Sequence, residues 1–139
     1  MNNISRFNEC TGKILAKLYE EFPIKTDLEY KEWLKEDENL NDKNTQEFCR
    51  ATIEWLEESG YIIVYGKYYY DMANKVILTQ KGLEALRAIP ESLEEGQKRR
   101  NIGEALVAAM KEKAPGATEW AVEQLSSRLF TESLKLFGI

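Results

Sequence analysis

The sequence predicts a mainly α-helical protein with one small antiparallel β-hairpin near its middle. Apolar residues recur at helical spacing before residue 60 and again after residue 78, and Pro23, Gly60 and Pro90 interrupt these segments. Between them, residues 61–65 and 75–78 are rich in β-branched and aromatic side chains, which is typical of strands. The length of 139 residues fits one domain, or one domain with an appendage.

Two helices are predicted before residue 44. Apolar positions on one helical face predict the first: Ile14, Leu15, Leu18, Tyr19 and Phe22. Pro23 ends this helix, because the residue before a proline disfavours helical backbone angles. Thr26 and Glu29 have the spacing of a capping box, so a short second helix is predicted to begin at Thr26. Residues 35–43 are polar and are interpreted as a loop.

A third helix is predicted over residues 44–59, with Asn44 as its N-cap and Gly60 just beyond its end. On a helical wheel its apolar arc holds Phe48, Cys49, Ala51, Thr52, Ile53, Trp55 and Leu56. The opposite arc, which we expect to face solvent, holds Gln46, Glu47, Arg50, Glu54, Glu57 and Glu58. This arc contains four glutamates and one arginine, so its net charge is −3.

The hairpin is predicted to run through residues 61–65, to turn at residues 71–74 and to return through residues 75–78. Gly66 marks a kink or bulge. Thr79 is predicted to cap a fourth helix, which Pro90 closes.

Residues 91–139 are predicted to form a helical hairpin appended to a domain of residues 1–90. Its apolar faces are wider than the two helices need to cover each other, which predicts a seam with a second copy or another protein. The residues expected in this seam are Val122, Leu125, Leu129, Phe130 and Phe137. Packing of this hairpin on residues 1–90 of the same chain is the alternative.

The order helix, hairpin, helix resembles winged helix-turn-helix domains. The ending L-T-x-K-G at residues 78–82 is similar to the junction between the wing and the following helix in PadR-like and MarR-like regulators. The resemblance covers roughly residues 5–90. It implies that residues 44–59 are the recognition helix and that residues 68–75 are the wing tip. It also implies a dimer. The wing residues expected to contact a ligand are Lys67, Tyr69, Asn74 and Lys75.

The charge of the chain disfavours nucleic acid as the ligand. The net charge is −5, and glutamates on a recognition helix repel nearby phosphates. We therefore expect a non-enzymatic regulatory or adaptor module that binds a protein partner, including a second copy of itself, through the acidic arc and the C-terminal helices. The alternative is a dimeric DNA-binding transcriptional regulator, to which two wings and the basic residues 98–100 would contribute. The tyrosines at positions 65 and 68–70 are expected to pack partly on the core, with base stacking as their alternative role.

The chain contains no histidine, which removes histidine bases, Ser-His and Cys-His pairs and most catalytic zinc sites. No phosphate-binding glycine motif, metal-ligand spacing or nucleophile motif is present. We expect no catalytic residue, metal site or cofactor. Cys10 and Cys49 are interpreted as isolated, reduced thiols, which together with the absence of a membrane span or signal peptide predicts a cytoplasmic protein with no membrane partner.

Overall fold

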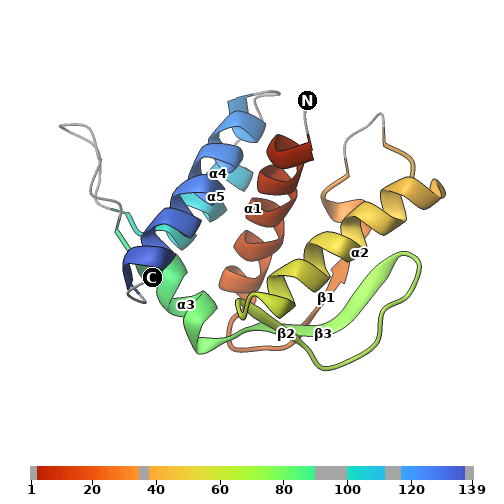
Figure 1. Ribbon diagram of the computed structural model, residues 1–139, viewed down its shortest axis with the longest axis horizontal. Coiled ribbons are helices and arrows are strands. Elements are labelled where there is room, and N and C mark those ends of the chain that lie inside the picture. The colour runs from red at the N-terminus through yellow and green to blue at the C-terminus, as the bar shows by residue number, and fades with distance from the viewer. Residues whose placement is uncertain (1–2, 35–37, 90–99, 112–116, 137–139) are drawn as a thin grey trace.

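The computed structural model describes residues 3–34, 38–89, 100–111 and 117–136 (Figure 1). Within these ranges the chain is mainly helical with a small antiparallel sheet, as predicted. The elements in chain order are α1 (Asn3–Glu21), β1 (Thr26–Glu29), the 3₁₀ turn η1 (Tyr30–Glu32), α2 (Lys43–Glu58), β2 (Ile62–Val64), β3 (Met72–Leu78), α3 (Gln80–Arg87), α4 (Ile102–Lys111) and α5 (Ala117–Leu136).

Helix α1 is the centre of the fold, with α4 and α5 on one side and α2 on the other, while the sheet runs along one end (Figure 1). The buried face of α1 carries the predicted Ile14, Leu15 and Leu18. Leu106 of α4 and Leu129 of α5 are fully buried in the same core. The hydrophobic core is therefore continuous across residue 90, and the C-terminal helices pack on α1 of their own chain.

The predicted helix beginning at Thr26 is wrong. The sheet has the order β1-β3-β2, so residues Thr26–Glu29 form an edge strand antiparallel to β3, and among the described residues before α2 this strand is followed by the 3₁₀ turn η1. Leu28 pairs with Ala73, and both side chains are fully buried. This long-range pairing outweighs the local capping signal, because it buries an apolar side chain and satisfies the backbone at once.

The predicted turn at residues 71–74 is also wrong, because β3 already begins at Met72. The chain reverses two residues earlier, over residues 69–72, where the Tyr69 N–H donates to the Met72 carbonyl at 2.7 Å. Asn74 acts across the hairpin instead: its Oδ1 accepts from the Lys67 N–H at 2.9 Å. A Cβ on Gly66 would lie 1.7 Å from that Oδ1, so only glycine fits at the predicted kink.

Helix α2 begins one residue before the predicted range. Its N-cap is Asp42, whose Oδ1 accepts from the Asn44 N–H at 3.1 Å, so the prediction of Asn44 as the cap is wrong. Gly60 has φ +87° directly after the C-cap Ser59, as expected for the residue that ends a helix.

Thr79 caps α3 as predicted. Its Oγ1 accepts from the Gly82 N–H at 3.0 Å and donates to the Gly60 carbonyl at 2.6 Å. One hydroxyl therefore joins the start of α3 to the end of α2.

We expect Thr79→Ala to lower the free energy of unfolding by about 1–2 kcal/mol, because both hydrogen bonds are lost. Thr79→Ser keeps the hydroxyl and should retain most of that stability. Urea denaturation followed by circular dichroism measures both variants. Equal midpoints for Thr79→Ala and the wild type would contradict this role.

Candidate functional site

An apolar groove of about 370 Å³ lies between the first turns of α1 and the middle of α2. Residues one helical turn apart line each wall, so the groove is about two turns long. The lining residues are Asn3, Ile4, Phe7, Phe48, Ala51, Thr52 and Trp55. Ile4 is 69% exposed and Trp55 is 45% exposed, which is unusual for side chains of this size. An exposed apolar groove of this kind is typical of a protein-binding surface.

An aromatic cluster supports the groove from beneath. The rings of Phe7 and Trp55 meet edge to face with centroids 5.1 Å apart. Phe130 of α5 lies below both, at 6.1 Å from Phe7 and 5.7 Å from Trp55, and Tyr61 contacts its other side at 5.7 Å. Three helices therefore fix the position of Trp55, so little side-chain entropy remains to be lost when a partner covers it.

Carboxylates follow one edge of the groove. Helical geometry places Glu47, Glu54 and Glu58 in a row beside Ala51 and Trp55, on the side away from α1. Glu47 and Glu58 are exposed to solvent. The groove therefore has an apolar floor and an acidic edge.

The predicted acidic arc is only partly available to a partner. The Glu57 carboxylate accepts from the Val64 N–H at 2.7 Å and so ties α2 to β2. Arg50 pairs with Glu54 at 3.5 Å, and its guanidinium lies 4.7 Å from the centre of the Tyr68 ring. Gln46 donates to the Leu40 carbonyl at 2.9 Å.

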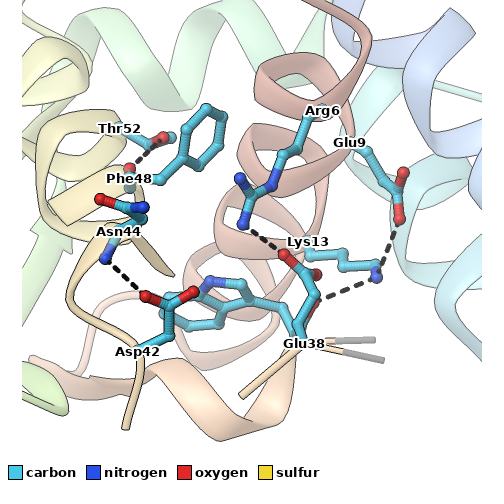
Figure 2. A network of polar contacts seen from close by, with 9 residues as sticks. Arg6, Glu9, Lys13, Glu38, Asp42, Asn44, Phe48 and Thr52 are labelled. Atoms are coloured by element: carbon cyan, nitrogen blue, oxygen red, sulfur yellow. Dashed lines mark hydrogen bonds and ion pairs between the residues drawn. The ribbon is translucent and has the colours of Figure 1, made fainter. Parts of the chain in front are cut away.

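Polar contacts hold α1 against the segment that leads into α2 (Figure 2). The Arg6 guanidinium pairs with Glu38 and also stacks on the Phe48 ring, 4.1 Å from its centroid. Lys13 pairs with Glu9 at 3.2 Å and donates to a backbone carbonyl at 3.3 Å. The two contacts of Arg6 thus join α1 both to the segment before α2 and to α2 itself.

Beside this polar network lies a cavity of about 20 Å³, to which Phe48 also contributes. Cys10 of α1 and Cys49 of α2 both line it, and their thiols are close enough for each to shift the pKa of the other. The pKa of Cys49 is lowered, chiefly by its interaction with the Cys10 thiol. The pKa of Cys10 is raised well above the usual value by the same interaction and by burial. The structure thus brings together two cysteines that the sequence presents as isolated.

Two tyrosine hydroxyls are buried beneath α2, on Tyr30 and Tyr68. Burial raises the pKa of Tyr68 to about 12, and it raises the pKa of Tyr30 further. Both phenols therefore stay protonated at neutral pH. Tyr68 holds the hairpin to α2, as expected for a tyrosine that packs on the core, whereas Tyr65 and Tyr70 are more than half exposed.

The predicted wing residues do not share one tip. Tyr69 is 49% exposed at the reversal of the hairpin, and Lys67 is exposed just before it. Asn74 and Lys75 instead lie within β3, where Lys75 has φ +58° and its N–H donates to the Asp27 carboxylate at 3.1 Å. This hydrogen bond lies at the position where the pairing of β1 with β3 shifts register.

The residues predicted for a seam between copies lie largely inside the chain. Val122 and Leu129 are fully buried, so these two cannot line an interface of this fold, which corrects that prediction for them. Leu125 and Phe130 are partly buried against the same core. Phe137 and the basic residues Lys98 and Arg99 lie outside the described residues, whereas Arg100 is exposed.

Sequence reasoning missed the groove itself. Ile4 and Phe7 precede the apolar pattern that predicts the first helix. Ala51 and Trp55 fall within the apolar arc of α2, but both are exposed in the structure. A wide apolar arc on a charged helix is the signal that could have indicated them.

Comparison with protein-family models, with curated proteins and with solved structures finds no match to this chain. Within the described ranges, no three cysteine or carboxylate side chains gather closely enough to hold a metal ion. The described helices include none with both the length and the apolar character needed to cross a membrane.

Proposed function

We propose that this chain is a non-enzymatic regulatory or adaptor module that binds an amphipathic, basic helix of a partner protein in the groove between α1 and α2. The observation that carries the proposal is the exposed Trp55, held by aromatic rings beneath it and edged by carboxylates. Tryptophan in such a position is typical of binding hot spots.

The shape and charge of the groove favour a helix over other ligands. Stretches of α1 and α2, each about two turns long, form its walls, and a third helix packs naturally into such a groove with apolar side chains at helical spacing. The row of Glu47, Glu54 and Glu58 favours lysines or arginines along the partner's flank. The C-terminal helices contribute by supporting the groove through Phe130.

A winged-helix architecture is part of this proposal. The order α1, β1, α2, β2, β3, α3 with β3 in the middle of the sheet supports it. Among the described residues between β1 and α2, the 3₁₀ turn η1 stands where the usual motif has a helix. In this architecture α2 corresponds to the recognition helix, whose acidic row then faces a basic peptide.

The test is a fluorescent synthetic peptide of about 18 residues, with leucines at helical i, i+3, i+4 and i+7 positions and lysines elsewhere. We expect a dissociation constant of about 1–10 µM at low salt, and roughly 30-fold weaker binding to Trp55→Ala, as for a hot-spot residue. Glu58→Lys should weaken binding and flatten its salt dependence. Fluorescence anisotropy measures each affinity.

The matched control is Tyr70→Ala, which removes an aromatic ring that is 66% exposed on the hairpin and distant in sequence from the groove. Its affinity should equal that of the wild type. A peptide of identical composition with its leucines scrambled should bind at least tenfold more weakly. Equal binding of the ordered and scrambled peptides, or no loss in Trp55→Ala, would contradict the proposal.

Nucleic acid is the second candidate ligand, and the exposed tyrosines of the hairpin favour it. Tyr65 is 57% exposed with the Lys25 ammonium 3.8 Å from its ring centre, and Lys67 is nearby in the chain. Aromatic rings beside cations suit single-stranded nucleic acid. Tight, strongly salt-dependent binding to an oligonucleotide that is abolished by charge reversal at Lys67 and Lys75 would favour this candidate over the protein partner.

A further inference from the structure

Cys10 and Cys49 form a thiol pair that bridges the two walls of the groove. Cys10 lies one turn after Phe7 on α1, and Cys49 follows Phe48 on α2. Both cysteines are buried and line the same small cavity, and each thiol shifts the pKa of the other. Two buried cysteines on separate helices that face one such small cavity are candidates for a disulfide between those helices.

We propose that this pair is an oxidation site, which a small peroxide converts to a disulfide that crosslinks α1 to α2. The cavity of about 20 Å³ exceeds the 10–15 Å³ that one water needs, so it admits only a very small oxidant. A bulky disulfide such as oxidised glutathione does not fit.

The two thiols have different roles in the reaction. Cys49 is the nucleophile, because its interaction with Cys10 lowers its pKa even though burial and the Glu38 charge act in the opposite direction. Trp33, which also lines the cavity, favours the same thiolate. Cys10 keeps its proton and is the resolving thiol.

Oxidation of the two thiols by peroxide takes two steps. The Cys49 thiolate attacks one peroxide oxygen, the O–O bond breaks, and hydroxide leaves while Cys49 becomes a sulfenic acid. The Cys10 sulfur then attacks the Cys49 sulfur and forms the S–S bond. The sulfenic hydroxyl leaves with the Cys10 proton as water. Overall, two thiols are oxidised and one peroxide is reduced to two waters. A small thiol reductant reduces the disulfide back to the two thiols and is itself oxidised to a disulfide.

The crosslink is expected to stiffen the groove, because it joins the two walls directly beside Phe48. It closes a loop of about 40 residues, for which the chain-entropy model gives a rise in the melting temperature of roughly 10 °C. The effect of the disulfide on partner binding rests on the proposed function, but the formation of the disulfide does not.

The first test treats the folded full chain with hydrogen peroxide and follows intact mass and free thiols. We expect both thiols to be lost together, with a mass lower by two hydrogens and the chain still monomeric on a non-reducing gel. Oxidised glutathione should leave both thiols free. Persistence of both thiols under peroxide that fully oxidises the urea-unfolded chain would overturn the proposal, as would disulfides only between chains.

Single substitutions separate the two roles. After peroxide treatment, Cys10→Ser should accumulate a Cys49 sulfenic acid, which adds one oxygen to the intact mass and which dimedone captures once the chain is unfolded in urea, whereas Cys49→Ser should give no such adduct. Equal labelling of the two variants would overturn the assignment of Cys49 as the nucleophile. The wild-type mass measurement remains decisive if either variant fails to fold.

Hydrogen exchange of the reduced and oxidised wild-type chains tests the stiffening without any ligand. Amides in the first turns of α1 and in α2 should exchange several-fold more slowly after oxidation, and those of α4 should not change. Equal exchange rates of the α1 and α2 amides in the reduced and oxidised chains would overturn the proposed stiffening of the groove. If the disulfide forms while the leucine–lysine peptide binds neither form, the proposed function fails and the oxidation site stands.

Discussion

We expect a Gly12→Ala variant to melt roughly 5–15 °C below the wild type, because α1 and α5 touch at this glycine. A Cβ at Gly12 would lie 2.3 Å from Val122 Cγ1 and 2.5 Å from Ser126 Oγ. Both neighbours are fully buried, so they have no free space into which to move. The helices must separate, and overpacking of this kind costs about 1–3 kcal/mol. Differential scanning calorimetry measures the loss.

The matched control for Gly12→Ala is a second substitution on the opposite helix. Val122→Ala removes the methyl groups nearest the new Cβ, so the double variant should be less destabilised than the sum of the two single variants. Additive losses would show that the helices do not meet at Gly12 as the structure describes.

We expect Phe130→Ala to weaken both the fold and the groove. This ring contacts Phe7, Trp55 and Tyr61, so its removal leaves a void beneath the groove. The free energy of unfolding should fall by about 3 kcal/mol, near the low end for loss of a buried phenylalanine because Phe130 is only partly buried. The leucine–lysine peptide should also bind more weakly, since Trp55 loses its support.

Two comparisons make the Phe130 result specific. Leu134→Ala, on the same helix and 49% exposed, should change the stability by no more than about 0.5 kcal/mol. Trp55→Ala should impair binding more than stability, because its ring is nearly half exposed. An unchanged urea midpoint for Phe130→Ala would contradict the aromatic support of the groove.

Local sequence signals predict the parts of this fold that depend on neighbouring residues. Gly60 ends α2 and Thr79 caps α3 because each acts within one helical turn of its own position. Thr26 misleads for the opposite reason: its partner in the sheet is Val76, fifty positions away, and no local pattern reports that pairing. Asn74 likewise resembles a turn residue in sequence because its amide bonds backbone groups, which it does here across the hairpin.

The candidate site was less predictable than the fold. A helical wheel identifies the apolar arc of α2, but whether Trp55 is covered depends on where α1 and α5 lie. The wheel also assigns Glu57 to a free acidic face, whereas β2 uses its carboxylate. The proximity of Cys10 and Cys49 follows only from the packing of α1 on α2, since nothing in their spacing links them.

The contact of Gly12 with Val122 has a consequence for how the chain is made. Helix α1 leaves the ribosome long before α5, and at about 5–20 residues per second the delay is several seconds. During that time the α1 side chains that later face α4 and α5 have no helices to cover them. We therefore expect nascent α1 to be a binding site for chaperones, and the final packing of the core to follow release of the chain.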